Sequence, residues 1–350
     1  MEAHARGRLD AVVHCGPIAV GVTAETPALR DRALAELKQF TARWDDPCAL
    51  IRVHLHATDE PVAMGAGRFL HCSGIRVDQT PSGLVAICRS GGSGIYEAAR
   101  CEWDLRIRPA SFAGAARPLE GPAPVAAPGA EDGAWAGDNM EDLLELILTT
   151  AWREVGWIPL HCGAVVSARR CALLMAPAKG GKSTLTAAML HRGWRTLGDD
   201  KLLIALRADG QPEVRGLTSQ FNLDPRASTW FPELGDLESL PRLSSWSAKR
   251  RVSIAGVWGD CFADRAVPTH VVSIRRVPEC VPTRVDRLAA SEVLLTLLRQ
   301  TVIPADPRTA KGILTVLARS ARTLRGVRVE IGDDAYRDPC SLDALEEQLE

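Results

Sequence analysis

The residues best suited to chemistry lie between positions 176 and 184. This stretch reads Ala176-Pro177-Ala178-Lys179-Gly180-Gly181-Lys182-Ser183-Thr184. It is close to the phosphate-binding pattern of Gly, four free positions, Gly-Lys and Ser or Thr, except that Ala176 replaces the first glycine. Glycines at the end of such a loop let successive backbone N–H groups turn inward and bind an anion at the start of a helix. Lys182 can then reach the outer phosphates of a nucleotide, and the Ser183 hydroxyl can bind Mg²⁺.

A strand and a helix must hold this loop in place. Apolar residues 171–175 predict a buried strand before it, and residues 184–192 predict a helix that ends at Gly193. A second short strand, 194–197, leads into Gly198-Asp199-Asp200. Of two carboxylates beside a nucleotide, one can bind the metal and the other can accept the proton of an attacking hydroxyl. On its own, Gly-Asp-Asp is better explained as a solvated turn, but its place after the loop favours a nucleotide site.

Two residues of the loop depart from the usual pattern. If the first position needs a positive φ, an alanine there costs about 1 kcal/mol relative to glycine. Lys179 adds a second cation, which either contacts a phosphate or points to water. The sequence therefore predicts a phosphate-binding loop of altered shape.

Composition sets the broad class of protein. The chain has 350 residues, 46% of them hydrophobic and 24% charged, with a net charge of −1. This length allows two domains, and this charge gives no reason to expect nucleic acid or an anionic membrane as a partner. The first residues do not resemble a signal peptide, and no apolar run reaches the length of a bilayer span. We therefore expect a cytoplasmic protein whose ten cysteines are reduced thiols.

The chain divides at a compositional boundary. Residues 1–108 predict an N-terminal α+β domain, with a helix over 28–44, a strand over 51–56, a hairpin over 74–89 and a strand over 103–107. Residues 109–137 are rich in Ala, Pro and Gly and predict a linker or mobile loop. Two histidines of the 51–56 strand, His54 and His56, share one face and could bind a metal.

The sequence predicts that residues 138–350 form the catalytic domain. An amphipathic helix begins at Asp138, and strands are expected over 161–166, 202–206, 271–277 and 327–331. Residues 216–248 are expected to be irregular. Helices are expected over 291–299 and 307–319, followed by a terminal helix capped by Ser341.

These residues resemble a known family. Leu160-His161-Cys162-Gly163-Ala164-Val165, the loop at 179–184, and Arg192-Gly193-Trp194-Arg195-Thr196-Leu197-Gly198-Asp199-Asp200 are similar to the catalytic core of HPr kinase/phosphorylase and its relatives. The resemblance covers roughly residue 138 to the end. It implies an α/β fold with a PEP carboxykinase-like P-loop kinase core and a mixed sheet.

The resemblance also implies roles for individual residues. Asp199 would be the catalytic base, and Ser183 with Asp200 would hold Mg²⁺. His161 would line the pocket near the phosphates, although a packed core histidine is the alternative. The nucleotide, ATP or GTP, would be bound by Lys179, Gly180, Gly181, Lys182, Ser183 and Thr184.

A basic run follows the irregular stretch. In a phosphotransfer site, a mobile cation could neutralise charge on the transferring phosphoryl group. Lys249-Arg250-Arg251 could supply such a cation, and we select Arg251 as the catalytic residue of the three. A solvated turn is the alternative explanation.

The chain also departs from the family. The downstream Glu-x-Arg-Gly-x-Gly signature is missing, and Lys179 stands where the family usually has glycine. The resemblance is therefore to the divergent branch linked to peptide modification, which includes kinases of lasso-peptide precursors. This implies a kinase that phosphorylates a serine hydroxyl of a peptide or small protein, and it leaves a homo-oligomer open. A small-molecule hydroxyl kinase and a non-catalytic nucleotide-binding regulator are the alternatives.

Overall fold

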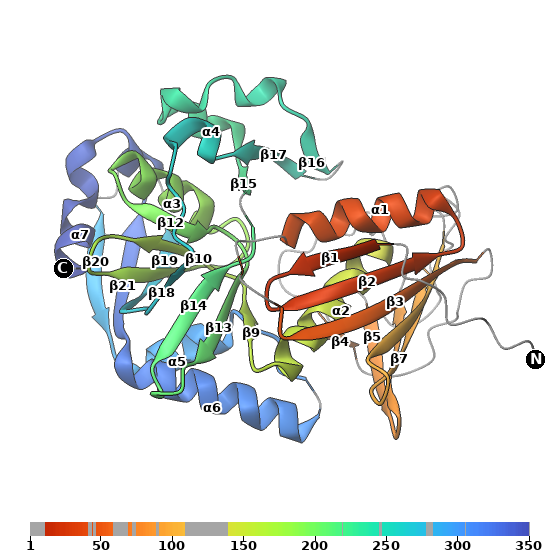
Figure 1. Ribbon diagram of the computed structural model, residues 1–350. Coiled ribbons are helices and arrows are strands. Elements are labelled where there is room, and N and C mark those ends of the chain that lie inside the picture. Colours follow the sequence, from red (N-terminus) through yellow and green to blue (C-terminus); the bar gives the residue numbers. More distant parts are fainter. Residues whose placement is uncertain are drawn as a thin grey trace, which may run out of the picture. The chain divides into compact units, whose positions relative to one another are not determined.

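A computed structural model describes residues 11–40, 44, 47–58, 69–71, 75–88, 91–108, 139–218, 220–244, 247–277, 283–304 and 306–349. The chain forms two compact units, one of Met1–Lys38 with Pro47–Ala151 and the other of Gln39–Asp46 with Trp152–Glu350. Both combine helices with mixed sheets, so the protein is α/β (Figure 1). The linker predicted over 109–137 lies outside the described residues, and the separate roles of 1–108 and 138–350 stay predictions. In the described part of the chain, no helix is long and apolar enough to cross a membrane.

Eight of the described strands form one sheet in the first unit. Their order is β1-β2-β3-β8-β7-β6-β5-β4. The bounds are β1 Ala11–Cys15, β2 Ile18–Ala24, β3 Ala49–Ala57, β4 Phe69–His71, β5 Ile75–Thr80, β6 Gly83–Cys88, β7 Ser93–Glu97 and β8 Glu102–Ile107. Strand β3 alternates strictly, burying Ile51, Val53 and Leu55, which confirms the predicted strand over 51–56. The β5–β6 hairpin and strand β8 are confirmed as well.

Two helices accompany this sheet. Helix α1 (Pro27–Leu37) begins at Thr26, whose hydroxyl accepts a hydrogen bond from the Leu29 N–H, and it ends well before the predicted position 44. A short 3₁₀ turn, η1 (Lys38–Phe40), follows it. Helix α2 (Asn139–Glu154) buries its apolar side, as predicted, through Leu143, Leu144, Ile147 and Leu148.

The histidine pair on β3 is held by neighbouring side chains. His54 Nδ1 lies 2.6 Å from the Thr23 hydroxyl, and His56 Nδ1 lies 2.8 Å from a Glu25 carboxylate oxygen. The described residues contain no cluster of three or more potential metal-binding side chains. The structure therefore gives no support to a metal site on this strand.

The second unit is built on a six-stranded sheet in the order β12-β10-β11-β19-β21-β20. Strands β11, β19 and β21 run parallel to one another, and the outer pairs are antiparallel. Consequently the carboxyl ends of the three parallel strands meet at one edge. The bounds are β10 Gly163–Val166, β11 Cys171–Met175, β12 Arg195–Gly198, β19 His270–Arg276, β20 Arg284–Leu288 and β21 Arg325–Ile331.

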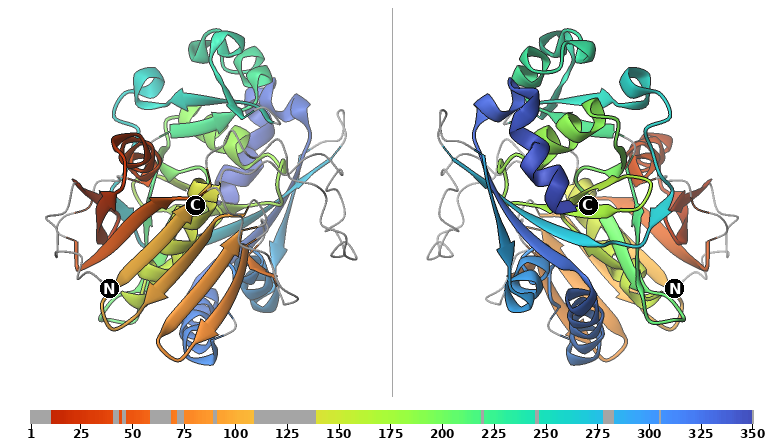
Figure 2. Two further views of the ribbon diagram at one scale, coloured as in Figure 1. Left: turned by 90° about the vertical axis from the view of Figure 1, so that its right-hand side faces the viewer. Right: turned by 90° about the vertical axis from the view of Figure 1, so that its left-hand side faces the viewer.

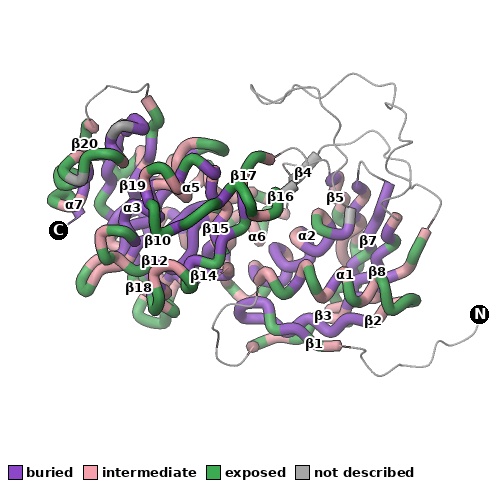
Figure 3. Tube along the Cα trace, turned by 90° about the horizontal axis from the view of Figure 1, so that it is seen from above, coloured by how far each residue is buried: buried purple, intermediate pink, exposed green. Residues whose placement is uncertain are grey.

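Both faces of this sheet are covered. Ala172 and Leu174 of β11 point to a core shared with α3 (Lys182–His191) and α7 (Asp343–Leu349). The alternate residue Leu173 points to a second core, with α5 (Ala290–Leu298) and α6 (Pro307–Thr323). Figure 2 shows these helix pairs on opposite sides of the sheet, and Figure 3 shows buried residues gathered along the central strands. Burial on both faces explains the continuous apolar run at 171–175.

Two smaller sheets complete this unit. One has the order β18-β14-β13-β9, with β9 Ile158–Leu160, β13 Leu202–Leu206, β14 Pro212–Gly216 and β18 Arg265–Ala266. The other has the order β15-β17-β16, with β15 Gln220–Leu223, β16 Arg242–Ser244 and β17 Ser247–Ser253, and it precedes α4 (Ala255–Trp258). The 3₁₀ turns η3 (Pro225–Thr229), η4 (Pro232–Leu234) and η5 (Leu237–Ser239) lie between β15 and β16. The stretch 216–248 is thus more ordered than the sequence predicts.

The start of the terminal helix differs from the prediction. Turns η6 (Asp333–Tyr336) and η7 (Pro339–Leu342) precede α7, which begins at Asp343. A carboxylate oxygen of Asp338 accepts the backbone N–H of Cys340 and caps η7. The prediction that Ser341 caps the terminal helix is therefore wrong, because a 3₁₀ turn occupies that position.

Candidate functional site

The loop at 176–181 connects buried β11 to α3. Gly181 precedes the helix with φ 93°, and Lys179 also has a positive φ of 60°. Ala176 is not among the described residues with positive φ, so the backbone strain expected at this alanine is not found. Lys179 is the non-glycine residue of the loop that adopts the unfavourable left-handed conformation. Because Gly181 has no side chain, it cannot cap the first N–H groups of α3. These N–H groups, at the positive end of the helix dipole, form a site suited to an anion.

Lys182 is the first residue of α3, and its side chain folds back under the loop. Its ammonium group donates to the Ala176 carbonyl oxygen at 2.8 Å and lies 2.9 Å from His161 Nε2. The residue is only 7% exposed. Burial lowers the pKa of Lys182, and the nearby Asp200 carboxylate acts in the opposite direction. A polyphosphate bound here would place negative charge beside the buried Lys182 ammonium.

His161 joins Lys182 to Asp200. It lies in the break between β9 and β10, where its backbone N–H donates to the Gln300 carbonyl oxygen at 2.7 Å. Its Nδ1 lies 3.3 Å from an Asp200 carboxylate oxygen. Because the Lys182 ammonium can only donate, Nε2 accepts from it and the ring proton of a neutral imidazole is on Nδ1, facing Asp200. His161 is therefore a polar link in the site rather than a packed core histidine.

Asp199 is the buried carboxylate of the site. The residue is 1% exposed, and neither carboxylate oxygen has a hydrogen bond of regular geometry within the described residues. Burial, with a contribution from Asp200, raises the pKa of Asp199 to about 7. The Ser183 side chain, the Lys249 ammonium and the Asn222 backbone act in the opposite direction and partly lower this pKa. A carboxyl group with such a pKa can exchange a proton near neutral pH.

A close approach of two strands sets the position of Asp199. Gly163 on β10 lies so near that an added Cβ would come within 2.9 Å of the Thr186 hydroxyl and 3.3 Å of the Asp199 Cα. Any residue larger than glycine would require the Thr186 hydroxyl to move and the Asp199 backbone to shift by a few tenths of an ångström. Sequence reasoning did not identify Gly163 as part of the site, although it lies in the segment that carries the family resemblance.

The three basic residues of β17 have different surroundings. Lys249 is close enough to lower the pKa of both Asp199 and Lys182. Arg250 is buried, donates to the Ala248 carbonyl oxygen and pairs with Glu238 at 2.7 Å. Arg251 is exposed and donates to the Gln39 side-chain oxygen at 3.1 Å. The structure thus brings Lys249 to the site and gives Arg251 a partner elsewhere.

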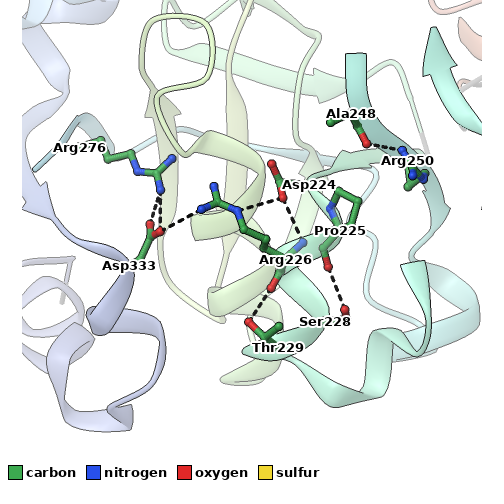
Figure 4. Close-up of polar contacts among 9 residues, drawn as sticks. All are labelled: Asp224, Pro225, Arg226, Ser228, Thr229, Ala248, Arg250, Arg276 and Asp333. Atoms are coloured by element: carbon green, nitrogen blue, oxygen red, sulfur yellow. Dashed lines mark hydrogen bonds and ion pairs between the residues drawn. The ribbon is translucent and has the colours of Figure 1, made fainter. Parts of the chain in front are cut away.

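A network of charges lies at the carboxyl ends of β19 and β21 (Figure 4). Arg276 donates to both carboxylate oxygens of buried Asp333, at 2.5 and 2.7 Å. Arg226 of η3 lies 3.6 Å from the same carboxylate and 3.3 Å from Asp224. This network fastens η3 to the edge of the sheet that carries the loop.

Most of the residues selected from the sequence come together. His161, Lys182, Ser183, Asp199 and Asp200 lie around the start of α3, within contact or charge range of one another. Gly180 turns the loop by donating its N–H to the Pro177 carbonyl oxygen at 3.0 Å, Thr184 is half-buried in the first turn of α3, and Lys179 is exposed. Hydroxyl and carboxylate oxygens are the ligands that Mg²⁺ prefers. Ser183 and Asp200, both close to the buried Asp199 carboxylate, supply oxygens of these two kinds and fit such an ion.

Comparisons with known proteins add little to this geometry. No protein-family model and no curated protein matches the chain. One solved structure with which it aligns is the Hpr(Ser) kinase/phosphatase from Coxiella burnetii, at 11% identity over 55% of this chain and 96% of that chain, with a TM-score of 0.30. A similarity this low carries no argument about function, which must come from the site itself.

Proposed function

We propose that the chain is a kinase that uses a nucleotide, ATP or GTP, with Mg²⁺ to phosphorylate a hydroxyl group. The observation that carries this proposal is the buried carboxylate of Asp199, beside Ser183 and the open start of α3. The loop, α3 and the two carboxylates would form a P-loop core of the PEP carboxykinase-like kind. In this proposal the anion-binding end of α3 and the proton-accepting group serve one reaction.

The loop and Lys182 would bind the phosphates. The backbone N–H groups at the start of α3 would surround the phosphate chain, and the Lys182 ammonium would carry the opposite charge. His161 would orient that ammonium, because its Nε2 lies only 2.9 Å from Nζ. Exposed Lys179 would add a weaker, screened contact.

The Ser183 hydroxyl and the Asp200 carboxylate would hold Mg²⁺. When bound, the ion neutralises charge on the phosphates. Asp200 is about one third exposed at its side chain, 34%, and is therefore the more accessible of the two carboxylates. Its contact with His161 Nδ1 fixes the carboxylate on the side of the phosphate-binding lysine.

Asp199 would accept the proton of the acceptor hydroxyl. As the acceptor oxygen bonds to the γ-phosphorus, the bond from that phosphorus to the leaving nucleoside diphosphate breaks, and the hydroxyl proton passes to Asp199. A pKa of about 7 suits this exchange, because the group is substantially ionised at neutral pH yet basic enough to take a proton. The burial of Asp199 requires the segment around Asn222 and Lys249 to shift before an acceptor reaches it.

The acceptor is proposed from the sequence resemblance, as a serine of a peptide or small protein. A direct test measures transfer of labelled γ-phosphate from MgATP and MgGTP to an array of serine-containing peptides, with glycerol and free serine as small-molecule acceptors. Binding of each nucleotide is measured by calorimetry, with and without a Mg²⁺ chelator. Transfer to peptides supports the proposal, and transfer to small molecules alone supports a small-molecule kinase. Binding without any turnover would indicate a nucleotide-binding regulator, and no binding would refute the proposal.

Two neighbouring cations of β17 provide an internal comparison. Because Lys249 lowers the pKa of Asp199, Lys249→Ala should move the midpoint of the activity–pH profile to higher pH and lower kcat at neutral pH about tenfold, a loss of one favourable charge contact. Arg251→Ala should stay within about twofold of the native rate, since an exposed side-chain contact contributes little. Phosphoryl-transfer rates of both variants, measured across a range of pH, test these two expectations. If Arg251→Ala lowers kcat more than Lys249→Ala does, Arg251 is the catalytic cation.

A further inference from the structure

A cavity of about 310 Å³ lies at the other end of the parallel strands from the phosphate-binding loop. Strand β11 starts at Cys171, β19 at His270 and β21 at Arg325, and the loop follows the opposite end of β11. Residues that line the cavity include Arg170, Gln211, Thr269, His270 and Arg325. Neither the proposed nucleotide site nor the proposed catalytic residues use this cavity.

Among the described residues that line the cavity, His270 is buried and has an unpaired ring nitrogen. It is 1% exposed, and its Nδ1 lies 2.9 Å from the Thr269 hydroxyl. Its Nε2 is buried and has no hydrogen-bond partner in the residues that the structure describes. A buried ring nitrogen without a protein partner destabilises the fold unless a water or a ligand pairs with it, so Nε2 is available to a bound group.

Positive charge faces this imidazole from two elements. Arg325 is the register partner of His270 on the adjacent parallel strand, so the two side chains leave the sheet on the same face. Arg170 precedes β11 and anchors the end of α7, donating from Nε to the Leu349 carbonyl oxygen at 3.0 Å. Burial and then these two guanidinium groups lower the pKa of His270 to about 4. His270 is therefore neutral at physiological pH, and the arginines supply the charge.

We propose that this cavity binds a small organic oxyanion, a metabolite that carries a phosphate or carboxylate group. Guanidinium groups are the side chains best suited to such groups, because they offer several donors together with a permanent charge. The Thr269 hydroxyl donates its single proton to the Cys171 carbonyl oxygen at 3.0 Å, so the neutral imidazole donates to it from Nδ1. His270 Nε2 is then an acceptor, which can pair with a hydroxyl of the metabolite or of a protonated phosphate while the arginines bind the charged oxygens. The volume leaves room for more than the anionic group itself.

The site has features that isolated surface arginines lack. Its imidazole is buried, and the backbone around it is fixed by hydrogen bonds between strands: the Arg325 N–H donates to the Thr269 carbonyl oxygen at 3.0 Å, and the Cys171 N–H donates to the Thr269 hydroxyl at 3.1 Å. Because these contacts belong to the sheet, the lining is formed before a ligand arrives.

The test follows the His270 ring by NMR in the full chain with isotope-labelled histidine, assigned by the signal lost in His270→Gln. Inorganic phosphate and citrate are titrated separately at constant ionic strength set with sodium chloride. We expect a saturable shift of the His270 signal with at least one of them. In Arg325→Gln, binding should weaken at least about tenfold, as expected when a charge-assisted contact is lost. Arg319→Gln, which changes an exposed arginine of α6, should bind as the native chain does.

Two results would overturn the proposal. One is a His270 signal that moves with neither anion, and the other is unchanged affinity in Arg325→Gln. Arg170→Gln serves as a second variant, and thermal unfolding of each variant shows whether it is folded. Phosphate that binds at the loop of α3 would leave the His270 signal in place, so this test does not depend on the proposed kinase activity.

Discussion

Replacing Asp199 by asparagine should lower kcat for phosphoryl transfer about 10²–10⁴-fold, the range that a general base contributes. Asparagine keeps the shape of the side chain but cannot accept a proton at neutral pH. Because the proposed phosphate-binding groups are Lys182 and the N–H groups at the start of α3, and not Asp199, nucleotide affinity should change little. Transfer rates and calorimetric affinities measure the two effects separately. Asp209→Asn, in the exposed turn between β13 and β14, is the matched control.

The dependence on Mg²⁺ distinguishes two roles for Asp199. If the variant regains activity when the Mg²⁺ concentration is raised, Asp199 is a metal ligand rather than the base, a role that its position beside Ser183 would permit. If activity stays low at every concentration, the base is supported. An unchanged kcat would refute both roles.

The same variant should be more stable than the native chain in alkaline solution. The pKa of Asp199 is raised by burial to about 7, from an ordinary value of 3.8. Above pH 7 the folded protein therefore holds a buried charge, and Asp199→Asn should raise the free energy of unfolding by roughly 1–2 kcal/mol. As pH falls from about 7 to about 4, the native carboxyl becomes protonated in the folded state first, so the difference should shrink. Chemical denaturation at several pH values measures this trend.

The core of the site could be predicted because its chemistry is local in sequence. A buried strand, a glycine-containing turn and a helix fix where Lys182 and Ser183 lie, since the helix begins directly after the turn. The sequence also placed Asp199 and Asp200 at the end of the next strand, β12. The sequence could not show which of these two adjacent carboxylates would be buried, because that depends on the direction that the chain takes after β12.

Long-range contacts explain what the sequence could not predict. Lys249 and Arg251 lie two residues apart on β17, so alternation places both on one face and cannot rank them. The ranking depends on which of them comes near Asp199 when the three-stranded sheet folds over the site. Gly163 likewise becomes recognisable only when β10 and β12 pair and the Asp199 backbone passes close to it. Pairings between distant segments leave no periodic signal along the chain.

Replacing Lys182 by methionine should reduce kcat/KM for the nucleotide about 10²–10³-fold, the cost of removing one well-placed charged donor from a phosphate-transfer site. Methionine retains the apolar stem in a position that is only 7% exposed, so the fold should persist. Affinity for a nucleoside triphosphate should fall while affinity for the nucleoside stays unchanged, because only the phosphates meet this ammonium. Calorimetry with both ligands makes the comparison.

The neighbouring lysine is the matched control for this prediction. Lys179 lies in the same loop but is exposed, so Lys179→Ala should cost no more than about fivefold, the limit expected of a solvent-screened contact. The contrast between the two variants follows from burial: a cation held at 2.8 Å from Ala176 O and 2.9 Å from His161 Nε2 is already in position, whereas an exposed one must be ordered at each binding event. Equal losses in the two variants would mean that the loop attracts the nucleotide by its overall charge. In that case Lys182 would have no special place in the chemistry.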